Sequence, residues 1–292
     1  MGMETARQTG AFSHVLENIP PPLRGFAGAA LQVGALEHLY AAASESNGGT
    51  LAQSVLSQLE IKICARPEDL AHVPVGGTAV VAANHPFGML DGLVLNAVLE
   101  GVRPDFKIVV NEMLDGISEL RDRFITVDVF GGRDAIRRNA AALREAVQWL
   151  RGGHLLVVFP SGEVSHWQSQ QRGIADPPWN TLAARCAIIA DAPVIPAFFT
   201  GDNSFVFQIA GFVHPWLRTA RLPAELLNKR GRTIEVRFGA AVSPRDLAQC
   251  GSLPRATSYL RARTYMLGRR QLNVSAPRPA FLPFRPRYGS HR

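Results

Sequence analysis

One histidine and one aspartate in the segment AVVAANHPFGMLDG, residues 79–92, are spaced for acid–base chemistry at a hydroxyl group. An apolar run leads into His85, and Asp91 follows six residues later. Pro86 and Gly88 can fold the connection back so that the carboxylate reaches the imidazole. That contact would set the ring tautomer, stabilise the imidazolium and leave the other ring nitrogen open to take a hydroxyl proton. We therefore predict that His85 is a general base oriented by Asp91.

The surroundings of this pair indicate which hydroxyl would be activated. No serine or cysteine stands beside His85 and Asp91 as a nucleophile, so the hydroxyl is expected to belong to a substrate and the reaction to be a direct transfer. The alternative is that His85 caps a turn and Asp91 caps the next helix, and on spacing alone the two interpretations weigh equally. Other histidines, such as His14, His38, His72, His154 and His214, have no comparable setting.

A second candidate segment is LLVVFPSGEVS, residues 155–165, where an apolar run breaks at Pro160. Gly162 would let backbone N–H groups approach a ligand, and the Glu163 carboxylate could bind an acceptor hydroxyl or amine. We expect this segment to face the same crevice as His85. The alternative is an ordinary turn between a strand and a loop.

A third candidate is FGGRDAIRRN, residues 130–139, which puts three arginines at the start of a helix. Helix N-termini attract anions, so this segment predicts a phosphate or carboxylate pocket, with Arg133 in the glycine loop as its best candidate. The alternative for Arg137 and Arg138 is that they point into solvent.

The elements that must position these residues alternate along the chain. Near-continuous apolar runs, typical of strands buried on both faces, predict strands at Thr78–Ala83, Lys107–Val110, Phe124–Val129, His154–Phe159, Pro193–Thr200 and Thr233–Phe238. Amphipathic segments predict helices at Leu90–Glu100, Ala135–Arg151 and Asn180–Asp191. This order predicts an α/β fold with a mostly parallel central sheet flanked by helices, whose strand carboxyl ends carry the site.

Three segments are expected along the chain. Residues 1–73 form an N-terminal helical lead or cap, with helices at Phe26–Tyr40 and Leu51–Leu59. Residues 74–270 form the α/β domain. Residues 271–292, rich in proline and arginine, form an extended tail.

Composition narrows the function classes. With 292 residues and 47% apolar content, the chain can bury a large core, so disorder throughout is excluded. Cys64, Cys186 and Cys250 are odd in number and lack metal-ligand spacing, so we expect a reducing compartment with no disulfide and no structural zinc. No bound metal or cofactor is expected. No apolar run reaches the length of a membrane span, and no secretory signal is visible, so a cytoplasmic location is expected.

The positive charge is concentrated at one end of the chain. The segment from Arg255 onward holds nine arginines and no acid, which leaves the rest of the chain slightly negative. Such a segment suits anionic lipid headgroups or an acidic carrier protein. Nucleic acid is not expected, because these residues lie in a tail rather than in a recognised nucleic-acid-binding fold.

Four blocks, NHPFGMLDG, FGGRDA, FPSGEVS and APVIPAF, together resemble the glycerolipid acyltransferase family over about residues 75–245. This family comprises the glycerol-3-phosphate and 1-acylglycerol-3-phosphate acyltransferases, and the likeness is greatest to its bacterial hemolysin-like branch, which includes ornithine-lipid-type enzymes. The resemblance implies that His85 and Asp91 are catalytic and that Arg133 holds the anionic group of the acceptor. It also implies that Gly162 and Glu163 line the acceptor site and that Pro193 to Pro196 shape the acyl side. The remaining predicted substrate contacts are Asn84, Gly88 and Ser161.

Two departures from the family pattern bear on the acceptor. Five residues separate His85 from Asp91, where the family usually has four, so the turn must bulge by one residue. The family usually has glutamate directly after Phe-Pro, whereas here Ser161 stands there and Glu163 follows Gly162.

The reaction implied is O-acyl transfer from acyl-CoA or acyl-ACP, as co-substrate, to a hydroxyl of a lysophospholipid or lyso-aminolipid. Backbone N–H groups near Gly88 or Gly162 would stabilise the oxyanion. The alternatives are a thioesterase or phospholipase, in which His85 activates water, and a non-catalytic lipid-binding or membrane-lytic protein.

The expected partners are the lipid acceptor, an anionic membrane surface at the inner face of the cytoplasmic membrane, and an acyl carrier protein. Membrane access is predicted for an aromatic and apolar group flanked by His214 and Arg218, together with residues of the tail. The residues are Phe212, Val213, Trp216 and Leu217, with Phe281, Phe284, Arg285 and Arg287 in the tail. The alternatives are core packing for the first group and disorder for the second.

Overall fold

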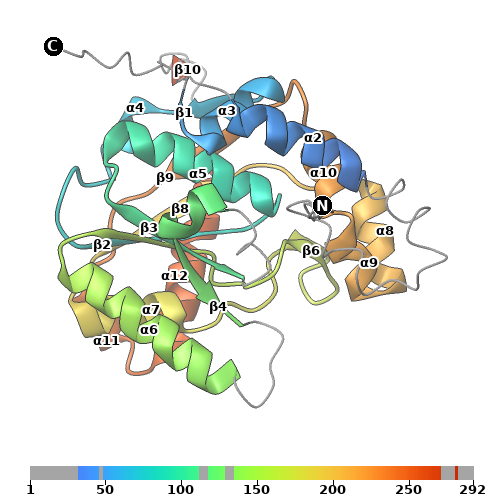
Figure 1. The fold of residues 1–292 in the computed structure, drawn as a ribbon. Coiled ribbons are helices and arrows are strands. Elements are labelled where there is room, and N and C mark those ends of the chain that lie inside the picture. The colour runs from blue at the N-terminus through green and yellow to red at the C-terminus, as the bar shows by residue number, and fades with distance from the viewer. Residues whose placement is uncertain (1–31, 46–48, 112–117, 129–134, 271–279, 282–292) are drawn as a thin grey trace, which may run out of the picture.

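The computed structural model describes residues 32–45, 49–111, 118–128, 135–270 and 280–281. They form one eight-stranded sheet with helices on both faces (Figure 1). The strand order is β10-β1-β9-β8-β2-β5-β3-β4. In chain order the strands are β1 Lys62–Ala65, β2 Ala79–Ala83, β3 Phe106–Asn111, β4 Phe124–Val127, β5 Leu155–Val158, β8 Val194–Phe199, β9 Thr233–Phe238 and β10 Ala280–Phe281.

The centre of the sheet is parallel. Strand β2 pairs in parallel with β5 on one side and β8 on the other, and β3 pairs in parallel with β5 and β4. Strand β9 runs antiparallel to β8, and β1 is parallel to β9. The carboxyl ends of β2, β5 and β8 therefore meet at one edge, where a parallel sheet builds its sites.

The helices cover the sheet in two layers, which Figure 1 shows above and below the strands. One face packs against α2 (Val33–Ser44), α3 (Leu51–Gln58), α5 (Met89–Val102) and α10 (Leu222–Leu227). The other face packs against α6 (Ala135–Arg151), α7 (Leu182–Ala190), α11 (Pro244–Gln249) and α12 (Leu253–Gly268). The short helix α4 spans Pro67–Leu70, and a 3₁₀ turn spans Ser118–Arg123.

Strand β2 shows why this sheet needs cover on both sides. Ala79, Val81 and Ala83 point into the first core, Val80 and Ala82 point into the second, and all five are fully buried. A strand buried on both faces has no polar alternation, which is the pattern of its sequence.

A smaller group of elements lies at one side of the molecule. It contains the hairpin of β6 (His166–Gln168) and β7 (Gly173–Ala175), the helix α8 (Phe205–Val213) and the helix α9 (Pro215–Ala220). Figure 1 shows α8 and α9 beside β6, away from α6 and α7.

The predicted fold class is confirmed, and the predicted strands and helices of the α/β domain lie where expected within two residues at each end. In the described part of residues 1–73, β1 joins the sheet and α2 and α3 pack on its core, while the predicted division of the chain into segments stays a prediction. Of the predicted tail, residues 280–281 pair with β1, and the remainder lies outside the described residues.

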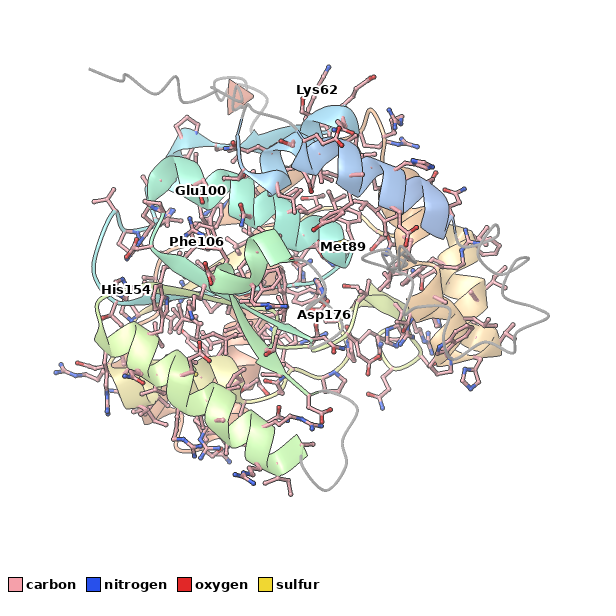
Figure 2. All side chains as sticks on the ribbon, viewed as in Figure 1. Lys62, Met89, Glu100, Phe106, His154 and Asp176 are labelled. Atoms are coloured by element: carbon pink, nitrogen blue, oxygen red, sulfur yellow. The ribbon has the colours of Figure 1, made fainter. Side chains whose placement is uncertain are left out.

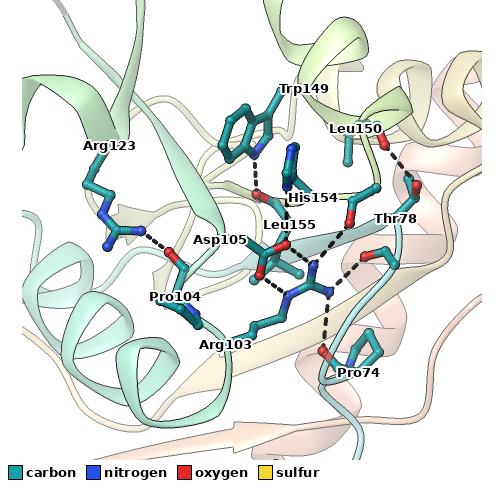
Figure 3. Close-up of polar contacts among 12 residues, drawn as sticks. Pro74, Thr78, Arg103, Pro104, Asp105, Arg123, Trp149, Leu150, His154 and Leu155 are labelled. Atoms are coloured by element: carbon teal, nitrogen blue, oxygen red, sulfur yellow. Dashed lines mark hydrogen bonds and ion pairs between the residues drawn. The ribbon is translucent and has the colours of Figure 1, made fainter.

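The amino edge of the parallel strands is held by one buried arginine (Figure 3). Arg103 is 1% exposed, and its guanidinium makes a bidentate contact with Asp105 at 2.8 and 2.5 Å. It also donates to the carbonyl oxygens of Pro74, Gly77 and Gly153, at 3.2, 2.8 and 3.3 Å. Five donors in a rigid fork can satisfy such a set of acceptors, so one side chain ties together the segments that enter β2, β3 and β5.

Candidate active site

The site begins where β2 ends. The Asn84 amide donates to the carbonyl oxygen of Phe199 at 3.0 Å, and its oxygen accepts from the Phe199 N–H at 2.7 Å. This side chain thus continues the β2–β8 ladder beyond the last backbone pair. Its contacts give Asn84 the role of holding the strand end, while the substrate contact predicted for it stays a prediction.

His85 and Asp91 come together across the turn that starts α5. The two atoms His85 Nδ1 and Asp91 Oδ2 lie 2.9 Å apart, and the carboxylate is fully buried. The same oxygen accepts the N–H groups of Phe87 and Gly88 at 2.9 and 3.0 Å, so Asp91 also caps its own helix. The capping interpretation therefore holds for Asp91, and the same oxygen also contacts His85, while the catalytic role of the pair stays a prediction.

Gly88 makes this turn possible and accommodates the additional residue between His85 and Asp91. Its φ of 77° lies in the left-handed region that glycine adopts without strain. A Cβ at this position would lie 3.0 Å from Leu222 and 3.1 Å from Val164, tighter than ordinary van der Waals contact. Its N–H is already bonded to Asp91, so in this conformation it is not an oxyanion donor.

The imidazole of His85 is buried on one edge and open on the other. Its side chain is 19% exposed, although Nδ1 is buried against Asp91 and its N–H direction is poorly aligned with the carboxylate oxygen. The ring stacks on Phe159, with 4.3 Å between ring centroids. Catalytic hydrogen bonds are often poorly aligned until substrate binds, so the misalignment of this 2.9 Å contact is compatible with a role of His85 as a base.

The electrostatics at Asp91 are dominated by burial. Loss of water raises the pKa of this carboxyl, and the contact with His85 and the two N–H groups opposes the rise. Its second oxygen, Oδ1, is buried with no hydrogen-bond partner. An imidazolium beside it would gain a desolvated counter-charge.

A second buried carboxylate, Asp176, binds the backbone of His85, and no sequence pattern predicted it. Its Oδ1 accepts the His85 backbone N–H at 3.1 Å and the Ser165 hydroxyl at 2.5 Å, and its Oδ2 accepts the Trp179 indole N–H at 2.8 Å. Burial raises the pKa of Asp176 as well. Ser165 closes the arrangement by donating its N–H to the His85 carbonyl at 2.8 Å.

The signal for Asp176 in the sequence is weak. It stands in ADPPW, which is typical of a turn, and 91 residues separate it from His85. Figure 2 shows Asp176 and Met89, the first residue of α5, toward the α8–α9 side of the molecule, with Phe106 and His154 toward the opposite side. Asp176 directly follows β7, and helix α12 also holds its backbone, because Tyr265 accepts the Asp176 N–H at 2.8 Å and Arg261 donates to the Asp176 carbonyl at 3.0 Å.

The segment FPSGEVS lies beside His85, as its place after β5 predicts. Phe159 contacts the imidazole, Ser161 donates to the Glu163 carbonyl at 2.8 Å, and Gly162, with φ 67°, donates to the Phe159 carbonyl at 3.1 Å. The Gly162 N–H is thus engaged within the turn, like that of Gly88. Glu163 is exposed and forms an ion pair with Arg218 of α9 at 2.7 Å.

The arginine segment is only partly described. Arg133 lies outside the described residues, so its predicted contact with an anionic group stays a prediction. Arg138 forms an ion pair with the buried Asp128, and Arg137 is exposed. These contacts leave Arg138 partly neutralised at the start of α6.

Within the described ranges no group of three or more His, Cys, Asp or Glu side chains could hold a metal ion. Cys64 and Cys186 are buried, and burial raises the pKa of the Cys186 thiol to about 12, which makes it a poor nucleophile. Among helices in the described part of the chain, none is long and apolar enough to cross a bilayer.

At the carboxyl edge of the parallel sheet, His85 contacts Asp91, and among the described residues no serine or cysteine side chain is bonded to the imidazole. An α/β protein with such a pair is suited to activate the hydroxyl of another molecule. The chain belongs to an acyltransferase family, since the family model described as "Acyltransferase" matches residues 61–274. The four sequence blocks lie within that match.

The known proteins that are similar to the chain include a curated lipid acyltransferase and a solved acyltransferase structure. The lyso-glycine lipid O-acyltransferase of Phocaeicola vulgatus is 24% identical over 180 residues, which cover 59% of this chain and 62% of that protein. The chain thus matches less than two thirds of that relative's length. The crystal structure of the 1-acyl-sn-glycerophosphate acyltransferase PlsC from Thermotoga maritima aligns with a TM-score of 0.48 and 16% identity, covering 84% of this chain and 87% of that chain.

Proposed function

We propose that the protein moves a fatty acyl group from an acyl thioester to a hydroxyl of a lysolipid. The observation that carries this proposal is the contact of His85 with Asp91, made by a ring whose other edge is open. The nearby hydroxyls of Ser165 and Ser161 donate to Asp176 and to the Glu163 carbonyl, respectively. Because neither is bonded to the imidazole, the hydroxyl that His85 activates is supplied by the substrate.

In the proposed reaction, His85 Nε2 takes the proton of the acceptor hydroxyl as its oxygen attacks the thioester carbonyl carbon. The carbon–sulfur bond then breaks, and the imidazolium returns the proton to the leaving thiolate. Asp91 stabilises the imidazolium between the two steps. A positioned base of this kind supplies about 10²- to 10⁴-fold in rate.

The acceptor is proposed to be a lyso-aminolipid or a lysophospholipid. Similarity to the Phocaeicola protein, whose name specifies a lyso-glycine lipid, favours the first. The donor is proposed to be acyl-CoA or acyl-ACP. The place of action is proposed to be the inner face of the cytoplasmic membrane, with the protein attached peripherally.

A reconstituted assay separates these possibilities. Purified protein would be given acyl-CoA or acyl-ACP with lyso-glycine lipid, lyso-ornithine lipid or lysophosphatidate, and the diacylated product would be measured by mass spectrometry. We expect product with at least one acceptor, and its formation should require His85.

The hydrolase alternative is tested in the same assay without acceptor. Release of free fatty acid at the rate seen with acceptor would contradict transfer and indicate a thioesterase. A protein that disrupts vesicles equally well with and without His85 would instead indicate a non-catalytic, membrane-lytic role.

A further inference from the structure

Helices α8 and α9 present a continuous apolar face to solvent. Large apolar side chains are usually buried, yet Phe205, Phe212 and Val213 are 76%, 67% and 71% exposed. We call the full set the α8–α9 face: Phe205, Val206, Ile209, Phe212, Val213, Trp216 and Leu217. A patch of this kind on a folded domain marks an interaction surface.

The face is held in a fixed orientation by the opposite side of α8. The exposed residues of α8 recur at helical spacing and form one stripe, whereas Phe207 and Gln208 point inward and are buried. Gln208 accepts the backbone N–H of Trp167 at 3.0 Å, which ties α8 to β6. Ser204 caps the helix and donates its hydroxyl to the buried Glu225 at 2.5 Å.

The charged residues of the segment that carries the face are cations, although the exposed Glu163 of a neighbouring segment pairs with Arg218. Residues 203–224 contain no aspartate or glutamate, and they include His214, Arg218 and Arg221. The Nε atom of Arg221 is buried with no hydrogen-bond partner. An apolar stripe bordered by cations and tryptophan suits the interface of an anionic bilayer, which offers hydrocarbon and negative headgroups within a few ångströms of each other.

The face also adjoins the candidate site. Arg218 of α9 is ion-paired with Glu163, next to Gly162 of the third block. Leu222, the first residue of α10, packs so closely on Gly88 that a Cβ there would lie 3.0 Å from it. Gly88 starts the helix that carries Asp91, so the segment that directly follows α9 contacts the turn holding His85 and Asp91.

We propose that the α8–α9 face docks on an anionic bilayer surface and inserts its apolar stripe at the level of the headgroups. The proposal deepens the proposed function, on which it rests, by naming the surface from which a lipid acceptor reaches His85. At nine residues, α8 is too short to span the hydrocarbon core, so the helix lies in the plane of the interface.

Vesicle sedimentation of the full-length chain tests the apolar part. The double variant Phe212→Asp/Val213→Asp should bind phosphatidylcholine vesicles containing roughly a third phosphatidylglycerol about tenfold more weakly, or worse. The matched control is Ile136→Asp/Met266→Asp, which changes two exposed apolar residues on α6 and α12 and should bind like the unchanged protein. Equal binding by the two double variants would overturn the proposal.

Arg221→Gln tests the electrostatic part. It should weaken binding to the anionic vesicles about fivefold, whereas Arg144→Gln, at an exposed position on α6, should leave it unchanged. Equal affinity of the unchanged protein for neutral and anionic vesicles would overturn the choice of an anionic surface.

A third measurement distinguishes failure of this proposal from failure of the proposed function. With a short-chain acyl thioester and a water-soluble acceptor, the Phe212→Asp/Val213→Asp variant should keep the turnover of the unchanged protein and lose activity only on vesicles. Vesicle binding that depends on the face, without transfer to any acceptor, would support the docking surface and reject the enzyme. Acyl transfer on vesicles that is unaffected by the double substitution would support the enzyme and reject the docking surface.

Discussion

The two edges of the parallel sheet hold buried charges in opposite ways. At the amino edge Arg103 satisfies Asp105 and three carbonyl oxygens, and this guanidinium holds the pKa of Asp105 below its usual range. At the carboxyl edge burial raises the pKa of Asp91 and of Asp176, and one oxygen of Asp91 has no partner. Both edges contain a histidine near an aspartate, since His154 lies 3.3 Å from Asp105.

The difference indicates which edge contributes to the stability of the fold and which edge has the environment suited to a reaction. A carboxylate that is paired with a cation and fully hydrogen-bonded is more stable ionised than protonated in the folded protein. Its ionisation therefore adds to the free energy of unfolding. A buried carboxylate with an oxygen that lacks a hydrogen bond lowers the free energy of unfolding when it is ionised. It can, however, stabilise a positive charge that forms beside it during a reaction. A histidine next to an aspartate is therefore a candidate base only where the second kind of environment surrounds it.

The largest expected effect is on activity at the carboxyl edge. His85→Ala should lower kcat/KM for acyl transfer about 10²- to 10⁴-fold, because the positioned base is lost, with unfolding in urea little changed. His154→Ala is the matched change at the amino edge and should retain activity. Equal loss of activity in both variants, or no loss in either, would contradict the claim that the two edges differ in function.

Asp91→Asn should lower kcat by a similar order while changing stability in the opposite direction. The raised pKa of Asp91 means that the folded state binds its proton more tightly than the unfolded chain. This group's contribution to stability is therefore lost as pH rises from about 4 toward the folded pKa, and asparagine abolishes that loss. Urea unfolding at pH 4 and pH 7 should show that the free energy of unfolding of the variant, relative to the parent, is higher at pH 7 than at pH 4. A variant that instead falls further behind at pH 7 would contradict this electrostatic account.

Arg103→Met should act on stability alone. Methionine keeps much of the volume but leaves Asp105 without its cation and three carbonyl oxygens without a donor, at a cost of about 3 kcal/mol in the free energy of unfolding. The specific activity of the folded fraction should be unchanged. Loss of turnover at full stability would mean that the amino edge takes part in the reaction.

Asp176→Asn sharpens the role of the second carboxylate. The amide can accept through only one of its two heavy atoms, so the His85 backbone, Ser165 and Trp179 can no longer all donate to it. We expect kcat to fall about tenfold with little change in KM, because the His85 imidazole would move out of position while the groups that bind substrate stay in place. Asp246→Asn, at an exposed position on α11, is the control. Equal changes in kcat and stability for both variants would remove Asp176 from the site.

The smallest effect is expected for Asp105→Asn. The lowered pKa of Asp105 adds stability above about pH 4, which is lost as pH falls through the folded pKa. The side chain is about a third exposed, so solvent screening keeps this contribution below about 1 kcal/mol. The variant should therefore differ from the parent at pH 7 and converge with it in acid, as followed by thermal unfolding. A difference that grows in acid would reverse the sign assigned to this pair.

The parts of the site that sequence reasoning found are local in the chain. His85 and Asp91 are six residues apart, and a proline and a glycine between them leave few ways to close the turn. Phe159 and Gly162 follow a strand whose place beside β2 comes from parallel pairing. Asp176 and the stack of His85 on Phe159 depend on segments 91 and 74 residues away, so their contacts have no short-range signal. Arg133 remains a sequence prediction.

What the sequence determined by itself was the alternation of buried strands with helices, the edge at which polar residues collect, and a histidine at a strand end with an aspartate six residues later. These depend on side-chain periodicity and on short loops, which neighbouring residues control. The tertiary structure decided which carboxylates lose water, which N–H groups are already bonded and that β1 joins the sheet. It also decided that Phe212 and Val213, for which the sequence left membrane contact and core packing open, are exposed. Desolvation and exposure arise from packing between segments that are distant in the chain, and for that reason no local pattern encodes them.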